Sequence, residues 1–298
     1  MELTEPQSPV LRLFRSEIYR LRRRWMPLLM LLIIALAAVG IYLLVYGSVQ
    51  AQLQAVRTGA IPPQPGGEQA MSQTLRELRP DRVQGFGVQI VSGLGSLMLI
   101  VFAASHIGTE FGWGTFRTLL AHGAGRGAFL GAKVLSLALY AAVFVFLGVV
   151  AAILGSYIVT AIAGEAASGP DIGAIADAGR RLYYTLLPYM VLATLIAVWS
   201  RSAGAGIAAG LVVYFTEGLV AQLLVSFNRD YANIVNYGLS RNVGALIRGA
   251  AGTTTIADPS AVGLPDQGRA ALLLGAYTVV FLALAYWRLR SRDVTVGG

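Results

Sequence analysis

The 298-residue sequence contains no cysteine, only two histidines and few charged residues. The absence of cysteine excludes disulfides, thiolate nucleophiles and metal sites built on cysteine. His106 and His122 alone leave little for zinc binding or acid–base chemistry. Charged residues make up 13% of the chain, whereas soluble domains contain about a quarter. A water-soluble protein of this size could not cover its surface with so few charges.

Sequence signatures of nucleotide and metal sites are also missing. There is no G-x-x-x-x-G-K-[ST] phosphate loop, because the nearest segment, 127–133, has Ala132 where the pattern needs glycine. His106 and Glu110 lie one helical turn apart and could be two metal ligands, but a polar pair at the end of a span is the simpler interpretation. We therefore expect a chain that is not an enzyme, with no catalytic, cofactor-binding or metal-binding residues.

Apolar residues dominate instead, at 56% of the chain, with a mean hydropathy of +0.64. They occur in runs of about twenty residues, which is long enough for a helix to cross a bilayer. The sequence predicts an all-α polytopic membrane protein with one transmembrane domain over residues 1–298. The six spans are expected at about 25–46, 86–107, 129–163, 182–199, 203–227 and 269–287. A short surface helix is expected at 68–78, a loop at 164–181, and a long loop at 228–268 that has room for short helices.

The residues before the first span predict an amphipathic helix over 9–24. Ser8-Pro9 is typical of a helix start, and apolar residues recur from Leu11 to Trp25 at three- and four-residue spacing among six arginines. Such a helix lies flat on an anionic membrane surface. The alternative, a cleaved signal peptide, fits poorly because the following apolar run exceeds the usual length of about 7–15 residues.

The positive charge of the chain, +8 overall, is distributed unevenly about the predicted spans. Six spans place both termini on one side, and that side carries 13 basic residues against five acidic ones. The opposite side carries 10 arginines and nine acids. By the positive-inside rule, both termini are expected in the cytoplasm, with the chain in the inner (plasma) membrane. The charge therefore indicates topology, and we expect no nucleic-acid partner.

The predicted cytoplasmic segment 109–120 is unusually apolar for a loop. Phe111, Trp113, Phe116, Leu119 and Leu120 fall within ten residues. Thr115 can cap a short helix whose apolar residues share one face. This surface fits either docking into a groove of a partner protein or burial in the lipid headgroup layer.

The order of elements and the residues of this segment resemble the permeases of type-2 ABC exporters. The family's loop after the second span has the pattern E-x-x-x-G-T-[LF]-[RE]-x-L-L, followed by a basic residue and a lysine that opens the third span. The matching residues are Glu110, Gly114, Thr115, Phe116, Arg117, Leu119, Leu120, Arg126 and Lys133. The proline usual in the linker is absent from residues 121–125.

The resemblance implies the transmembrane subunit of an ATP-driven exporter. Two permeases, a second copy or a paralogue, would form the substrate path in the bilayer. Separate cytosolic ATPase subunits would hold ATP and Mg²⁺, in agreement with the missing phosphate loop. Residues 110–120, including Phe111 and Trp113, would form the coupling helix that receives the motion of the ATPase.

The fifth predicted span contains a G-x-x-x-G pair and an acidic residue. Gly206 and Gly210 have the spacing that permits close helix packing. Glu217 lies on the same stripe and, at a cost of about 3 kcal/mol for insertion, should face away from lipid. It could serve packing, or it could line the substrate path. Gln89, Ser92 and Ser96 give the second span a matching polar stripe.

A functional alternative is a secondary transporter or channel that works without ATP. That class predicts internal repeats with matching broken helices, and we find no convincing repeat between residues 1–150 and 151–298.

Overall fold

The computed structural model describes residues 9–62, 64–113, 115, 118, 125–251 and 263–291, and every regular element in these ranges is helical. Six of the described helices are long and apolar enough to cross a membrane. They are α2 (Trp25–Arg57), α4 (Phe86–Gly112), α6 (Arg126–Ile162), α7 (Ile172–Ser200), α8 (Ala203–Phe227) and α11 (Gln267–Ser291). The predicted all-α architecture with six spans is confirmed.

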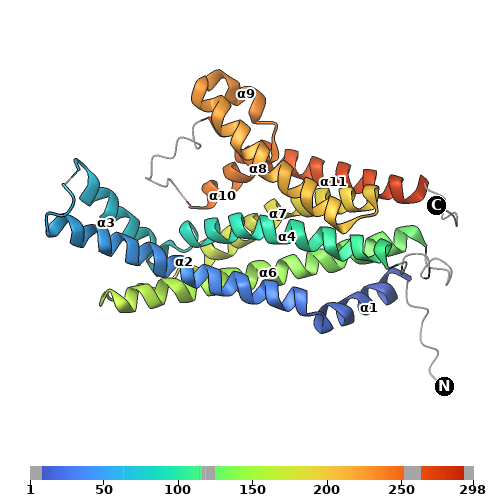
Figure 1. The fold of residues 1–298 in the computed structure, drawn as a ribbon, viewed down its shortest axis with the longest axis horizontal. Helices are drawn as coiled ribbons and strands as arrows, with labels where there is room; N and C mark the ends of the chain where they lie inside the picture. Colours follow the sequence, from blue (N-terminus) through green and yellow to red (C-terminus); the bar gives the residue numbers. More distant parts are fainter. Residues whose placement is uncertain are drawn as a thin grey trace.

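The helices run side by side, and both described chain ends lie at the same end of the bundle (Figure 1). We call this the terminal end. Helix α1 (Pro9–Arg23) lies there, and Arg126 Nη1 at the start of α6 donates to the Arg290 carbonyl near the end of α11, at 2.6 Å. In α4, α6 and α7, at least half of the apolar stretch is buried, against less than a fifth in α2, α8 and α11. The outer three therefore present apolar surface for lipid or other chains to cover.

Helix α7 is longer than the predicted fourth span, and the loop expected over 164–181 is wrong for residues 172–181. The Asp171 carboxylate accepts a hydrogen bond from the backbone N–H of Ala174 at 2.9 Å and caps the helix. Asp177 then pairs with Arg180 at 2.6 Å and with Arg181 at 2.7 Å. These local polar contacts make the first turns helical although their sequence is not apolar.

The segments between spans contain shorter helices. Helix α3 (Gly67–Glu77) agrees with the surface helix expected at 68–78. The long segment after α8 contains α9 (Ala232–Val235) and α10 (Leu239–Ala251). Helix α10 packs against α7, α8 and α11, so this segment belongs to the bundle rather than forming a free loop.

Helix α8 is held close to α4 and α7 by glycines. A Cβ on Gly206 would lie 2.9 Å from the Cβ atoms of Ala104 and Ala197, and one on Gly210 would lie 2.7 Å from Cγ2 of Ile100. On α4, a Cβ on Gly108 would overlap the backbone of Ala203. Small residues at these points allow the helix axes to approach. The structure thus places Gly206 and Gly210 where the predicted packing role requires them.

Candidate functional site

The terminal end of α4 carries the predicted coupling residues that the structure describes. Glu110 and Phe111 belong to the last turn of α4, and Trp113 follows it with 70% of its surface exposed. Thr115 is also described. The remaining predicted coupling residues lie outside the described residues: Gly114, Phe116, Arg117, Leu119 and Leu120. The coupling helix itself therefore stays a prediction.

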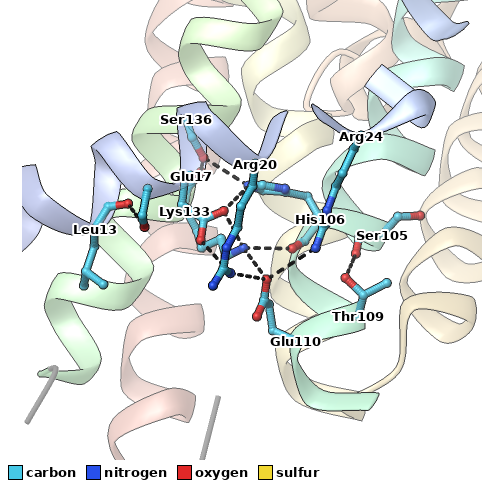
Figure 2. Close-up of polar contacts among 11 residues, drawn as sticks. Leu13, Glu17, Arg20, Arg24, Ser105, His106, Thr109, Glu110, Lys133 and Ser136 are labelled. Carbon is cyan, nitrogen blue, oxygen red and sulfur yellow. Dashed lines mark hydrogen bonds and ion pairs between the residues drawn. The ribbon is translucent and has the colours of Figure 1, made fainter. Parts of the chain in front are cut away.

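Next to this end, a buried lysine joins three helices (Figure 2). Lys133 Nζ, on α6, lies 2.8 Å from Glu17 Oε2 on α1 and 2.8 Å from Glu110 Oε1 on α4. The lysine is 0% exposed, Glu17 is 4% exposed and Glu110 is 1% exposed. Such charges are stable in an apolar interior only when they are paired. Lys133 is therefore the common counter-ion of two carboxylates from different helices.

Two arginines complete this group on the side of α1. Arg20 Nη1 lies 3.5 Å from Glu17 Oε1 and 3.4 Å from Glu110 Oε1. Arg24 Nη2 lies 4.0 Å from the same Glu110 oxygen. Glu17 and Arg20 share one face of α1 because they are three residues apart. We call Glu17, Arg20, Arg24, His106, Glu110 and Lys133 the charge cluster; it links α1, α4 and α6.

His106 belongs to the charge cluster through its Nε2 atom. That atom lies 3.0 Å from Ser136 Oγ and 3.5 Å from Glu17 Oε2. Since Ser136 Oγ donates its own hydrogen to the Lys133 carbonyl at 2.8 Å, it accepts from His106, and we assign the hydrogen to Nε2. Among the described residues, no group of three His, Cys, Asp or Glu side chains is placed to hold a metal ion.

A second site is a cavity of about 350 Å³ between α4, α7, α8 and α10. Its lining includes Ser92, Ser96, Ser240, Tyr189 and Tyr214. The two tyrosine rings meet edge to face, with centroids 5.2 Å apart. Of the predicted path residues, Ser92 and Ser96 therefore line a cavity. Gln89 is exposed on α4 and Glu217 is on α8, and neither is among the cavity's lining residues.

Glu217 is half-buried and contacts the backbone of a neighbouring helix. Its Oε1 accepts a hydrogen bond from the backbone N–H of Ser240 at 3.0 Å, in the first turn of α10. A Cβ on Gly238 would overlap this carboxylate, so glycine is needed for the close approach. The first N–H groups of a helix lack acceptors within the helix. Glu217, on the neighbouring span α8, supplies the acceptor for one of them. This geometry favours the packing interpretation of Glu217 over a substrate contact.

Sequence reasoning missed the charge cluster. Glu17 counted only as a charge on the terminal side, Lys133 and Glu110 also as residues of the permease pattern, and His106 with Glu110 as a polar pair; nothing in the sequence joined them. In the structure, His106 and Glu110 both contact Lys133, through a backbone carbonyl at 3.3 Å and a carboxylate at 2.8 Å respectively. The available signal was a glutamate on the apolar face of the first helix, three residues before an arginine on the same face.

The six long apolar helices indicate a multi-pass membrane protein. A sequence profile described as ABC-2 family transporter protein matches residues 11–294. The chain therefore belongs to the ABC-2 family of transporter proteins, and the predicted resemblance to type-2 ABC permeases is confirmed. No curated protein matches the chain significantly.

Proposed function

We propose that this chain is the transmembrane subunit of an ATP-driven exporter and works as a dimer with a second copy or a paralogue. ATP and Mg²⁺ bind to separate cytosolic ATPase subunits, and this chain is not itself an enzyme. The family match over residues 11–294 carries the proposal. The missing phosphate loop agrees with it, since hydrolysis then needs another chain.

The charge cluster gives this proposal a mechanical basis. A partner that pushes on the segment after Gly112 displaces the end of α4, where Glu110 lies. Through Lys133, that displacement reaches α6 and α1, because the three helices share one set of ion pairs. The same helix α4 carries Ser92 and Ser96 at the cavity beside α8. Motion of α4 therefore links the proposed ATPase contact to the proposed path.

The docking role is tested by replacing Trp113 with alanine. An exposed tryptophan at the centre of an interface typically contributes about 2 kcal/mol or more, so association with the cognate ATPase should weaken about 30-fold or more. The measurement is the dissociation constant of the purified subunits, together with the ATPase activity of the reconstituted complex. Trp287→Ala is the matched control, since Trp287 on α11 is 56% exposed and lies outside the predicted coupling segment.

Retention of full affinity and full ATPase activity by Trp113→Ala would contradict the docking role and assign the ring to the headgroup layer. Hydrolysis of ATP by the permease purified alone would contradict the division of labour between subunits.

The proposed orientation has both termini in the cytoplasm, on the basis of the positive-inside rule. The chain has no native cysteine, so single cysteines can be labelled without background. Ser72→Cys on α3 and Ser291→Cys at the end of α11 replace exposed serines at opposite ends of the bundle. An impermeant thiol reagent added to intact cells should label Ser72→Cys and spare Ser291→Cys until the cells are opened. The reverse pattern would invert the assignment.

A further inference from the structure

A cavity of about 480 Å³ lies where α1 and α2 meet α4, at the terminal end. One part of its lining is apolar, from Leu21, Met26, Pro27 and Phe102. Another part is basic, from Arg23 and Arg24. A cavity with an apolar wall and a cationic edge fits a ligand that is itself apolar at one end and anionic at the other.

The charges around this cavity do not balance. Among the described residues, Arg20, Arg24 and Lys133 of the adjoining charge cluster face two carboxylates, those of Glu17 and Glu110. Arg24 is the most distant of these cations, at 4.0 Å from its carboxylate oxygen. Arg23 adds a further positive charge, and its guanidinium lies over the Tyr19 ring at 4.8 Å. With His106 neutral, the region carries two more cations than anions, which favours an anionic ligand.

The side chains, and not the backbone, supply the positive charge of this region. Arg24 separates α1 from α2 in an extended conformation, with φ −87° and ψ 134°. The negative dipole end of α1 and the positive dipole end of α2 therefore meet at the same point and offset each other. His106 also lines the cavity; its Nδ1 carries no hydrogen in the assigned tautomer and can only accept a hydrogen bond.

The position of the cavity identifies the kind of anion. Trp25 is 87% exposed beside it, and exposed tryptophans are typical of the membrane–water interface. Arg24 directly precedes the transmembrane helix α2. Leu21 and Phe102 are buried, whereas Met26 is 37% exposed. A soluble phosphate would leave Trp25 and Met26 uncovered, whereas a lipid would cover them.

We propose that this cavity binds an acidic phospholipid. The phosphodiester lies at Arg23 and Arg24, and the upper acyl chains cover Trp25 and Met26. Basic pockets between transmembrane helices are suited to such headgroups. The bound lipid neutralises part of the excess charge beside the charge cluster and so stabilises the junction of α1 with the bundle.

The test uses the full-length permease purified in a neutral detergent. Native mass spectrometry measures the dissociation constants of dioleoyl phosphatidylglycerol and dioleoyl phosphatidylcholine, which differ in headgroup charge and share their acyl chains. The double variant Arg23→Gln, Arg24→Gln should bind phosphatidylglycerol about 30-fold more weakly, because each basic residue near an anionic lipid contributes about 1 kcal/mol. Arg22→Gln is the matched control, since Arg22 is an exposed arginine of the same helix that does not line the cavity.

The expected result is tighter binding of phosphatidylglycerol than of phosphatidylcholine by the wild type and by Arg22→Gln, with the difference lost in the double variant. If the double variant does not fold, Arg23→Gln alone should weaken binding about fivefold. Equal binding of the two lipids, or an equal loss in Arg22→Gln, would overturn the site. Displacement of the lipid by millimolar inorganic phosphate would overturn the lipid as its occupant. The measurement involves no ATPase subunit, so its outcome is independent of the proposed transport function.

Discussion

Replacing Lys133 with methionine is expected to lower the free energy of unfolding by about 3–5 kcal/mol, the cost of removing one partner from a buried ion pair. Methionine nearly preserves the volume of the side chain, so packing alone predicts a small effect. The large cost arises because Glu17 and Glu110 stay buried, at 4% and 1% exposure, after their shared ammonium group is gone. Arg20, at 3.5 Å and 3.4 Å from these carboxylates, offsets only part of the loss, because its contacts are longer and its side chain is partly exposed.

The measurement is reversible unfolding of the purified permease in mixed micelles. The matched comparison is the triple variant Lys133→Met, Glu17→Gln, Glu110→Gln, which removes the carboxylate charges together with the ammonium charge. This variant should recover most of the lost stability, since replacing a whole buried ionic group with neutral residues is often close to neutral. A single variant Lys133→Met that loses less than about 1 kcal/mol would show that water or another cation reaches the carboxylates.

Replacing Glu217 with leucine should lower the free energy of unfolding by about 1–3 kcal/mol, because the backbone N–H of Ser240 at the start of α10 loses its hydrogen-bond acceptor. Glu217→Gln is the matched control, since its amide oxygen can still accept from Ser240. Hydrogen exchange at the first turn of α10 should therefore accelerate in Glu217→Leu and change little in Glu217→Gln.

Measurements on the reconstituted complex distinguish the two possible roles of Glu217, which are helix packing and contact with a substrate. If Glu217 holds α10 in place, Glu217→Gln keeps normal stimulation of the ATPase by transported compounds. If the carboxylate contacts a polar or cationic substrate, Glu217→Gln loses this stimulation while α10 stays protected from exchange. That second result would contradict the packing interpretation.

The sequence predicted the features that depend on local composition. Apolar runs of about twenty residues predicted six spans, and α8 has the predicted bounds, Ala203–Phe227. Periodic apolar residues predicted the helix before the first span, and α1 covers Pro9–Arg23. The predicted boundaries failed at α2, which continues to Arg57 instead of ending near residue 46, and at α7, where Asp171 and the Asp177 ion pairs start the helix before the hydropathy rises.

The contacts of the candidate sites depend on residues far apart in the chain. Glu17 and Lys133 are separated by 116 positions. The spacing of apolar residues predicts contacts within one helix, and it does not predict contacts between α1 and α6, which have other helices between them in sequence. Glu217 likewise lies 23 positions before Ser240, so its placement inside a span was predictable but its partner was not. The sequence could indicate that a buried charge needs a counter-ion. Only the packing of α1, α4 and α6 shows which residue that counter-ion is.

Lys133 has a consequence for how the protein can be observed. It is the only lysine in the sequence, and it is 0% exposed. With α1 seated against α4 and α6, the chain offers amine-reactive reagents and lysine-directed crosslinkers no side-chain target. Labelling of the Lys133 side-chain amine therefore reports on the contact of these three helices. The amine is protected while α1, α4 and α6 are packed together, and it reacts once they separate.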